Sequence, residues 1–186
     1  MFISLSRYAK PCGIGSLLIQ ITMNYQQIID KYYTEDNSLR RLLLKHSRQV
    51  ADRCLIICNK HPELKIDQQF VEDAAMLHDI GIRWCSAPSI FCYGSEPYIK
   101  HGPIGGELLR KEGWPQHARV AERHTGTGLP GYEPETLEEQ LVCYADKFYS
   151  KSRPDHVLTI GEAAQSLEKF GHEGVEKFLA WAKMFE

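Results

Sequence analysis

Apolar residues recur three and four positions apart over most of the chain, which is the spacing of one face of an α-helix. The clearest example runs from residue 38 to about residue 59, and its apolar positions are Leu39, Leu42, Leu43, Val50, Cys54 and Ile57. His46 falls on the same face of this predicted helix. The pattern therefore predicts an imidazole ring that points toward the protein core.

The same spacing predicts six later helices, whereas segments with the alternation of a strand are scarce. These helices cover residues 67–78, 101–112, 115–124, 136–152, 160–170 and 172–185. Asp67 is a good N-cap, and Pro103 and Pro115 suit the first turn of a helix. In the last two helices we expect four core side chains, those of Phe170, Phe178, Leu179 and Trp181. The sequence thus predicts an all-α fold, a compact multi-helix bundle.

Residues 82–99 break the helical spacing. They contain Pro88, Gly94 and Pro97, so we expect an ordered loop that could act as a lid. The loop carries four aromatic residues: Trp84, Phe91, Tyr93 and Tyr98. Two interpretations stay open, because these rings could stack on the base of a ligand or could only pack the loop against the protein.

The chain has 186 residues, enough for one domain that buries roughly two-thirds of the surface exposed by the unfolded chain. Residues 1–22 lack helical spacing, whereas Met23 directly precedes a good helix start at Asn24, with Gln27 placed as in a capping box. We therefore expect residues 23–186 to form a single domain. Residues 1–22 are expected to be an N-terminal extension that is either loosely ordered or not part of the natural protein.

Composition excludes several classes of protein. Hydrophobic residues make up 43% and charged residues 25%, with a net charge of -2, which is typical of a soluble globular protein. This charge gives no basis for binding a nucleic-acid polymer, and the longest apolar tract, residues 14–21, is too short to span a membrane. The six cysteines include no Cys-x-x-Cys pair. We favour buried thiols in a reducing cytoplasm over a metal site made of Cys54, Cys58 and His61.

The residues that carry chemistry form an ordered set of histidines and aspartates. The adjacent pair in this set follows an apolar helical segment, and the six members are His46, His78, Asp79, His101, His124 and Asp146. A lone histidine on an apolar face is more often a core residue held by a hydrogen bond, but the whole set favours metal binding. Imidazole nitrogens and carboxylate oxygens suit divalent iron, manganese, cobalt or nickel, whereas structural zinc more often takes thiolates. The set predicts a metal centre built across several helices.

In this order the six residues resemble those of the HD superfamily of metal-dependent phosphohydrolases, in its six-ligand, two-metal form, over about residues 39–152. The resemblance implies an HD-domain bundle with the metal centre in its core. One metal ion would be held by His46, His78, Asp79 and Asp146. The second would be held by His101 and His124, with Asp79 bridging the two. The resemblance also makes His78 and Asp79 the catalytic pair and iron the first expected metal, with manganese, cobalt, nickel or magnesium as alternatives.

The implied activity is hydrolysis of a phosphoester or phosphoanhydride of a small nucleotide by a hydroxide that bridges two divalent metal ions. Residues 122–128 resemble a segment of the bacterial hydrolases that split diadenosine tetraphosphate symmetrically, so a dinucleoside polyphosphate is one substrate to expect. Two alternatives stay open: an HD-type di-iron oxygenase, and a nucleotide-binding regulator without turnover. The protein could act as a homodimer.

A phosphorylated substrate needs cationic groups in addition to the metals. Five such residues lie close in sequence to the proposed ligands: Arg83, Lys100, Arg123, Lys147 and Lys151. Most surface lysines and arginines are simply solvated, so each of the five has this alternative. We expect Arg83 and Lys147 to be the best placed for substrate phosphate.

Overall fold

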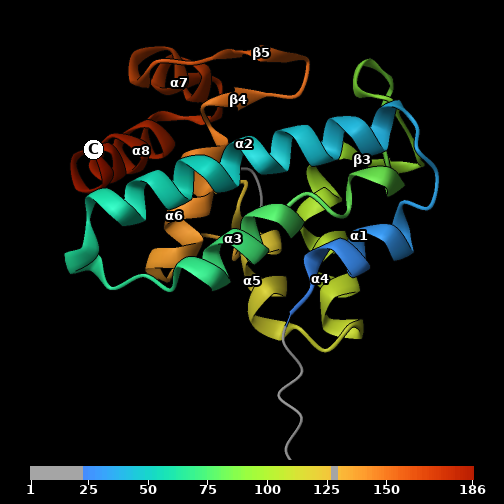
Figure 1. Cartoon of the computed structure of the whole chain (residues 1–186). Coiled ribbons are helices and arrows are strands. Elements are labelled where there is room, and N and C mark those ends of the chain that lie inside the picture. The colour runs from blue at the N-terminus through green and yellow to red at the C-terminus, as the bar shows by residue number, and fades with distance from the viewer. Residues whose placement is uncertain (1–22, 127–129) are drawn as a thin grey trace, which may run out of the picture.

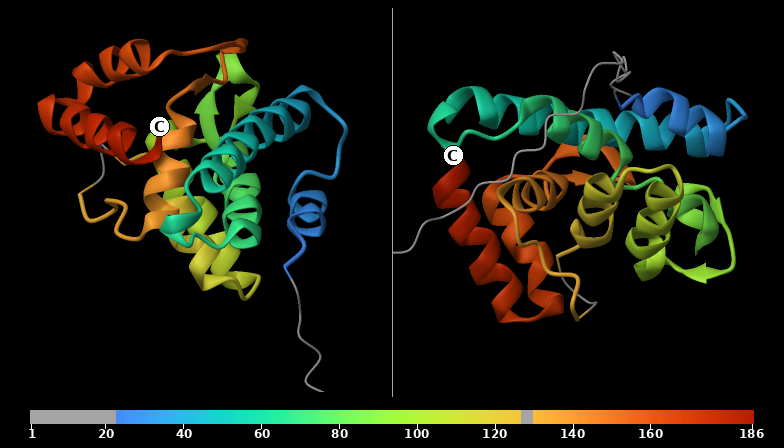
Figure 2. Two further views of the ribbon diagram at one scale, coloured as in Figure 1. Left: turned by 60° about the vertical axis from the view of Figure 1, so that its left-hand side comes forward. Right: turned by 90° about the horizontal axis from the view of Figure 1, so that it is seen from below.

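The computed structural model describes residues 23–126 and 130–186. The predicted extension at residues 1–22 and residues 127–129 lie outside this range. In the described part the α-helices are α1 (Tyr25–Tyr32), α2 (Ser38–Lys60), α3 (Gln68–Leu77), α4 (His101–Lys111), α5 (Pro115–Arg123), α6 (Leu137–Asp146), α7 (Ile160–Leu167) and α8 (His172–Phe185). Helix α2 runs across the molecule, with α7 and α8 near one end and α1 near the other (Figures 1 and 2). The predicted all-α architecture is confirmed.

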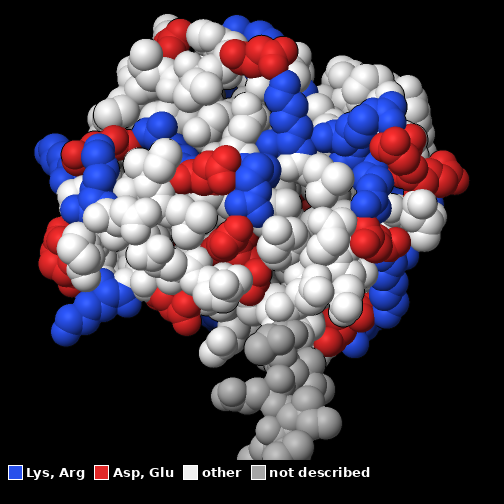
Figure 3. Space-filling model, viewed as in Figure 1, with Lys and Arg blue, Asp and Glu red and all other residues white. Residues whose placement is uncertain are grey.

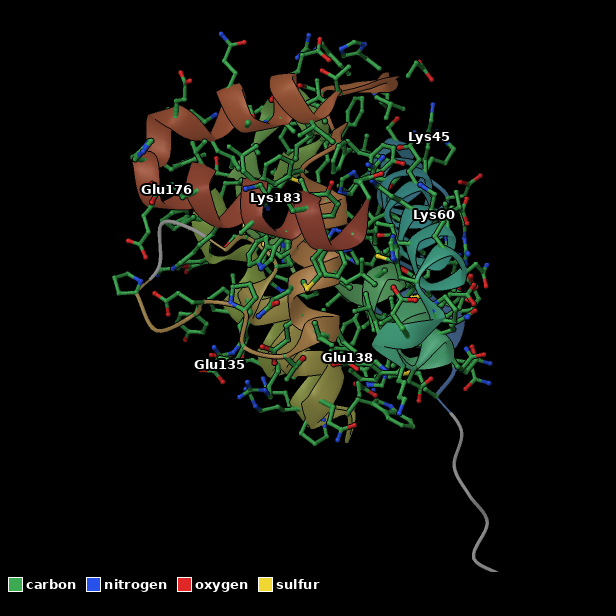
Figure 4. All side chains as sticks on the ribbon, turned by 90° about the vertical axis from the view of Figure 1, so that its left-hand side faces the viewer. Lys45, Lys60, Glu135, Glu138, Glu176 and Lys183 are labelled. Carbon is green, nitrogen blue, oxygen red and sulfur yellow. The ribbon has the colours of Figure 1, made fainter. Side chains whose placement is uncertain are left out.

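Helix α2 separates neighbouring residues into an inner and an outer face. The side chain of Asn37 caps it by accepting a hydrogen bond from the Arg40 backbone N–H at 3.0 Å. His46 is 1% exposed among the buried apolar residues of this helix. Lys45, one position earlier, points outward and pairs with Asp155 at 2.6 Å; Lys60 also lies on the outside of α2 (Figure 4). The predicted inward orientation of His46 is confirmed.

Local capping residues mark the starts of several other helices. The Asp67 carboxylate accepts a hydrogen bond from the Phe70 N–H at 3.1 Å, which starts α3 as predicted. Thr136 forms a capping box with Glu139 at the start of α6, and Thr159 starts α7 in the same way. These starts depend on hydrogen bonds within four residues, so the sequence was sufficient to place them.

The segment predicted as a loop is instead a compact unit of very short strands and 3-10 turns. Its elements are η2 (Ile82–Trp84), β1 (Cys85–Ala87), η3 (Pro88–Ile90), β2 (Cys92–Tyr93), β3 (Glu96–Pro97) and η4 (Tyr98–Lys100). Strand β1 pairs antiparallel with β2 and parallel with β3, in the order β2-β1-β3. Strands of two or three residues leave no readable alternation in the sequence, which is why the prediction missed them.

The helix predicted for residues 136–152 ends at Asp146, and that prediction was too long. A hairpin follows, formed by β4 (Tyr149–Ser150) and β5 (Arg153–Val157), and Lys151 lies in the turn between them. Phe148 continues the helical spacing of α6, but it is 1% exposed and belongs to the core next to the hairpin. Gln49 of α2 donates a hydrogen bond to the Pro154 carbonyl at 2.9 Å, so contacts distant in sequence hold the hairpin.

An aromatic cluster joins α6 and the hairpin to α8. Tyr144 lies 5.0 Å from Phe148 and 5.1 Å from Phe178 between ring centroids, and Phe178 is buried as predicted. Phe170 and Leu179 are 52% and 40% exposed, so predicting them as core was wrong. The buried residues of α8 are Phe178, Ala182 and Phe185, which form one narrow stripe. Leu179 follows Phe178 directly and therefore falls off that stripe.

The surface mixes both signs of charge. On the face shown in Figure 3, basic and acidic side chains lie next to one another. Ion pairs between surface residues include Lys31 with Glu112, at 2.7 Å. Within the described residues, no helix combines the length and the apolar character needed to cross a membrane. The described cysteines are buried free thiols. Cys54 donates to the Leu141 carbonyl at 3.9 Å, whereas His61 pairs with Glu63, so these contacts do not form the alternative Cys/His site.

Candidate metal centre

Helix ends bring five of the six predicted ligand residues together, and the sixth comes from the interior of a helix. His46 projects from the middle of α2, and His78 and Asp79 follow the last residue of α3. His101 is the first residue of α4, His124 caps the end of α5, and Asp146 is the last residue of α6. At a helix end the chain can turn a side chain toward a common point without breaking a helix interior. The centre therefore collects side chains from five helices.

The two oxygens of Asp79 face two different groups of histidines. Oδ2 lies 3.3 Å from Nε2 of both His46 and His78. Oδ1 lies 3.3 Å from His101 Nε2 and 3.5 Å from His124 Nε2. This arrangement forms two clusters, and in each the ligand atoms lie close enough together to share a cation. The first cluster is His46, His78 and Asp79, and the second is Asp79, His101 and His124.

Asp146 completes the first cluster. Its Oδ1 lies 2.9 Å from His46 Nε2 and 3.5 Å from His78 Nε2. Its Oδ2 faces the Lys147 ammonium at 3.1 Å. The structure thus places all six predicted ligand residues in one buried site, divided as the resemblance implies.

The hydrogen bonds of the histidines test whether the site suits a cation. The Nδ1 atoms of His78, His101 and His124 donate to backbone carbonyls of Ala75, Tyr98 and Ala121 at 2.6, 2.5 and 2.7 Å. A carbonyl only accepts, so each Nδ1 carries the hydrogen and Nε2 of a neutral ring presents a lone pair. The Nε2 atoms of His101 and His124 lie 2.9 Å apart, which brings two lone pairs together. A divalent cation between them fits this donor set.

Burial and charge set the protonation of the site. Burial lowers the pKa of His46 and His124 to about 4 and also lowers that of His101, which favours the neutral ring that binds a cation. Burial also opposes the charged form of Asp79, but Lys151 and His78 outweigh it and hold the pKa of this carboxyl well below its usual range. For His78 burial acts downward, but the Asp79 and Asp146 carboxylates raise its pKa to about 9. A cation bound there would displace a proton.

Comparison with known protein families places this geometry in context. The HD domain family matches residues 43–150, which contain the whole ligand set.

The chain belongs to the HD domain family.

Relatives of this HD protein include two proteins named tRNA (cytidine(56)-2'-O)-methyltransferase. The one from Thermoplasma volcanium is 26% identical over 151 residues, covering 74% of this chain and 40% of the relative; the one from Picrophilus torridus is 27% identical over 154 residues, covering 72% and 41%. An uncharacterized protein of Methanocaldococcus jannaschii is 30% identical over 122 residues, covering 54% and 66%. The chain thus spans about two fifths of the length of the two methyltransferases. No solved structure matches it.

Two of the five predicted substrate cations lie at the centre of the HD domain. The Lys147 ammonium donates to the His124 carbonyl at 3.0 Å as well as facing Asp146. The Lys151 ammonium, from the turn between β4 and β5, lies 2.6 Å from Asp79 Oδ2. Both side chains are almost buried, with 14% and 13% exposed. Burial alone would lower the pKa of each lysine, but neighbouring groups, Asp79 and Asp146 among them, raise it, so both ammonium groups stay charged.

The other three cations have partners elsewhere in the described chain, and their role in binding substrate stays a prediction. Lys100 forms an exposed ion pair with Glu96 at 2.9 Å. Arg123 donates to the Glu133 carbonyl and pairs with Glu135 at 3.1 Å. Arg83, predicted to be among the best placed, donates to the Tyr32 carbonyl. Each is close to a ligand in sequence but points away from it, because neighbouring residues diverge in direction on helices and turns.

A cavity of about 240 Å³ opens beside the second cluster of the HD domain and is lined by His101, His124, Asp146, Lys147 and Lys151, among others. Of the four aromatic residues in the predicted loop, Tyr98 lines this cavity and stacks on the His101 ring at 4.5 Å. Trp84 packs edge-on against Tyr32 at 5.9 Å, while Phe91 and Tyr93 are 44% and 76% exposed. Trp84 therefore packs the segment against the protein and Tyr98 faces the site, whereas stacking on the base of a ligand stays a prediction.

His117 is a buried histidine outside the centre. It is 7% exposed and packs against Phe70 at 4.6 Å and Trp114 at 5.7 Å between ring centroids. Neither of its ring nitrogens has a hydrogen-bond partner within the described chain, and burial lowers its pKa to about 4. The ring thus serves the core of the HD domain as a neutral group.

We expect His117 to make the protein sensitive to acid. The unfolded chain takes up this proton near pH 6.5, whereas the folded chain does so only near pH 4. The contribution of His117 to stability is therefore complete above pH 6.5 and is lost as the pH falls toward 4. When the pH falls from 7.5 to 5, the free energy of unfolding should decrease by about 2 kcal/mol less in His117→Leu than in the wild type. Urea titration at the two pH values measures this difference.

His172→Leu is the surface control, since the side chain of His172 is 85% exposed. The same pH slope in wild type and His117→Leu would contradict the neutral, buried state of His117.

Proposed function

We propose that this HD protein is a metal-dependent phosphohydrolase that cleaves a phosphoester or phosphoanhydride of a small nucleotide. The observation that supports it most is the sharing of Asp79 between two histidine clusters, beside a cavity that holds two lysine ammonium groups. The clusters provide the donor set for cations, and the lysines provide charge complementary to phosphate. The oxygens of a phosphoryl group in this cavity would meet both.

Each residue has a role in this proposal. One cation would be held by His46, His78, Asp79 and Asp146, and a second by Asp79, His101 and His124. When bound, divalent cations of this kind make a water nucleophilic at neutral pH and neutralise charge on a phosphoryl group. Lys147 and Lys151 would bind phosphate oxygens. Tyr98 orients His101 through its carbonyl and covers the imidazole with its own ring.

Assays for turnover test the activity. The purified protein would be loaded separately with iron(II), manganese, cobalt, nickel and magnesium, and supplied with nucleoside mono- and diphosphates and with dinucleoside polyphosphates. Release of phosphate or of a nucleotide product is expected, with iron(II) or manganese the most active. Oxygen consumption coupled to an organic product would instead indicate a di-iron oxygenase. Nucleotide binding without turnover under every metal would indicate a regulator, and either result would contradict the proposal.

Removing metal should lower the thermal stability of the protein. A ligand at a thousand times its dissociation constant stabilises the folded state by about 4 kcal/mol. For a chain of this size, that free energy corresponds to a shift in melting temperature on the order of 10 °C. Calorimetry of the loaded protein, before and after dialysis against a chelator, measures the shift. An unchanged melting temperature with saturating iron(II) or manganese would show that the six residues hold no cation.

A further inference from the structure

Part of the wall of the cavity comes from a segment beyond the family match. The match ends at residue 150, but Lys151 and the end of α7 also line the cavity, followed by η5 (Glu168–Phe170). The β4–β5 hairpin leads directly into α7 at one end of the molecule (Figure 1). The HD core therefore supplies the metal ligands, while a separate segment supplies another part of the binding surface.

The part of the cavity wall formed by η5 differs in chemistry from the part formed by the proposed metal ligands. Phe170 is 52% exposed although it lines the cavity, and the Lys169 ammonium lies 4.9 Å from the centre of its ring. Leu167 adds a buried apolar surface, and Ile99, 37% exposed, adds another side chain to the same lining. The cavity thus combines ammonium groups beside the carboxylates with an aromatic and aliphatic part. A ligand that satisfies both carries phosphate at one end and a flat apolar group at the other.

The size of the cavity limits how much of such a ligand it can enclose. Pockets that enclose drug-sized molecules measure roughly 300–1,000 Å³. At about 240 Å³, this cavity falls below that range, so we expect it to enclose only the phosphate end of a nucleotide. The base would then extend to the margin of the cavity, where an exposed ring provides a stacking surface for any base.

We propose that Phe170 is a specificity-determining residue that stacks on the base of a nucleoside monophosphate, while Lys147 and Lys151 bind its phosphate. This inference rests on the proposed function, because it places the phosphate in the same cavity. It also narrows the substrate class: the second nucleoside of a dinucleoside polyphosphate would lie outside the cavity. The base-stacking group comes from η5 and not from the aromatic segment at residues 84–98.

Binding of two non-hydrolysable probes tests the proposal on manganese-loaded protein by calorimetric titration. One probe is the phosphonate analogue of adenosine 5'-monophosphate, in which CH2 replaces the ester oxygen, and the other is the same analogue of ribose 5-phosphate, which has no base. Phe170→Ala should weaken binding of the adenosine probe about tenfold or more and change binding of the base-free probe less than twofold. Phe170→Tyr should keep the affinity for the adenosine probe within about threefold, because the aromatic face remains.

Phe91→Ala is the matched control, since Phe91 is 44% exposed and lines a different hollow together with Arg83 and Tyr93. It should leave the binding of both probes unchanged. The proposal is overturned if wild type does not bind the adenosine probe, if Phe170→Ala leaves its affinity unchanged, or if that substitution weakens both probes equally. Binding through Phe170 without turnover of any phosphoester would retain this inference and refute the proposed function. Turnover combined with binding independent of Phe170 would do the reverse.

Discussion

Asp79→Asn should lower turnover by about a thousandfold or more and should deplete the bound metal. The two oxygens of Asp79 face different clusters, 3.3 Å from His46 Nε2 on one side and 3.3 Å from His101 Nε2 on the other. An amide offers one weakly basic oxygen and a nitrogen that cannot bind a cation, so one cluster loses a ligand and the other keeps only a weaker one. Cations stabilise the transition state by several kcal/mol, and losing this stabilisation lowers the rate by about a thousandfold.

Metal analysis of the purified variant, together with turnover under saturating iron(II) or manganese, measures both effects. Asp155→Asn provides the control, because this aspartate is 88% exposed and pairs with Lys45 on the outside of α2. It should retain the metal content and turnover of wild type. A variant at position 79 with unchanged metal and activity would exclude a shared carboxylate as the basis of the site.

Gly81→Ala should destabilise the fold and weaken metal binding at the second cluster. A β-carbon at this position would lie 2.1 Å from the His101 carbonyl oxygen and 2.6 Å from the Gly105 backbone nitrogen. Both are backbone atoms of α4, so the helix must move as a unit, and His101 moves with it. Overpacking of this kind costs about 3 kcal/mol.

Urea denaturation would measure the loss of stability, and a manganese titration followed by calorimetry would measure the loss of affinity. Gly161→Ala is the matched control, because the nearest atom to its new β-carbon is Thr159 Oγ1 at 4.0 Å. That variant should be more stable than wild type by about 0.4–1 kcal/mol, since alanine restricts the unfolded chain. Equal stability of the two variants would show that α4 does not pack closely on the turn after His78 and Asp79.

The sequence was sufficient for most helices because their starts are local. Asn37, Asp67 and Thr136 each cap a helix through a hydrogen bond to a backbone N–H three residues later. The end of α6, in contrast, depends on contacts with residues distant in sequence. Phe148 keeps the helical spacing, and only packing against α8, together with the hydrogen bond from Gln49 to the hairpin, shows that the chain has left the helix.

The sequence was likewise sufficient for one part of the candidate site, the proposed ligands, and insufficient for another part, the cations. The six proposed ligands could be chosen because their order resembles the ligand set of the HD superfamily. The cations could not be chosen by closeness in sequence. Lys151 reaches Asp79 from a hairpin that the sequence did not indicate, whereas Lys100, next to His101, pairs with Glu96. Phe170 was expected in the core, since an exposed ring and a buried ring have the same helical spacing.

The ligands also span a long stretch of the chain, and this affects the order in which the protein can be assembled during synthesis. His46 and Asp146 lie 100 positions apart yet come within 2.9 Å of each other. On the ribosome, the first histidine is therefore synthesised 100 residues before the last carboxylate. The chain loses conformational entropy when a loop of that length closes, and this loss comes before the contacts at the ends of the loop can stabilise the fold. The six residues therefore come together only when the chain folds, and a truncated product ending before Asp146 lacks one of the six proposed ligands.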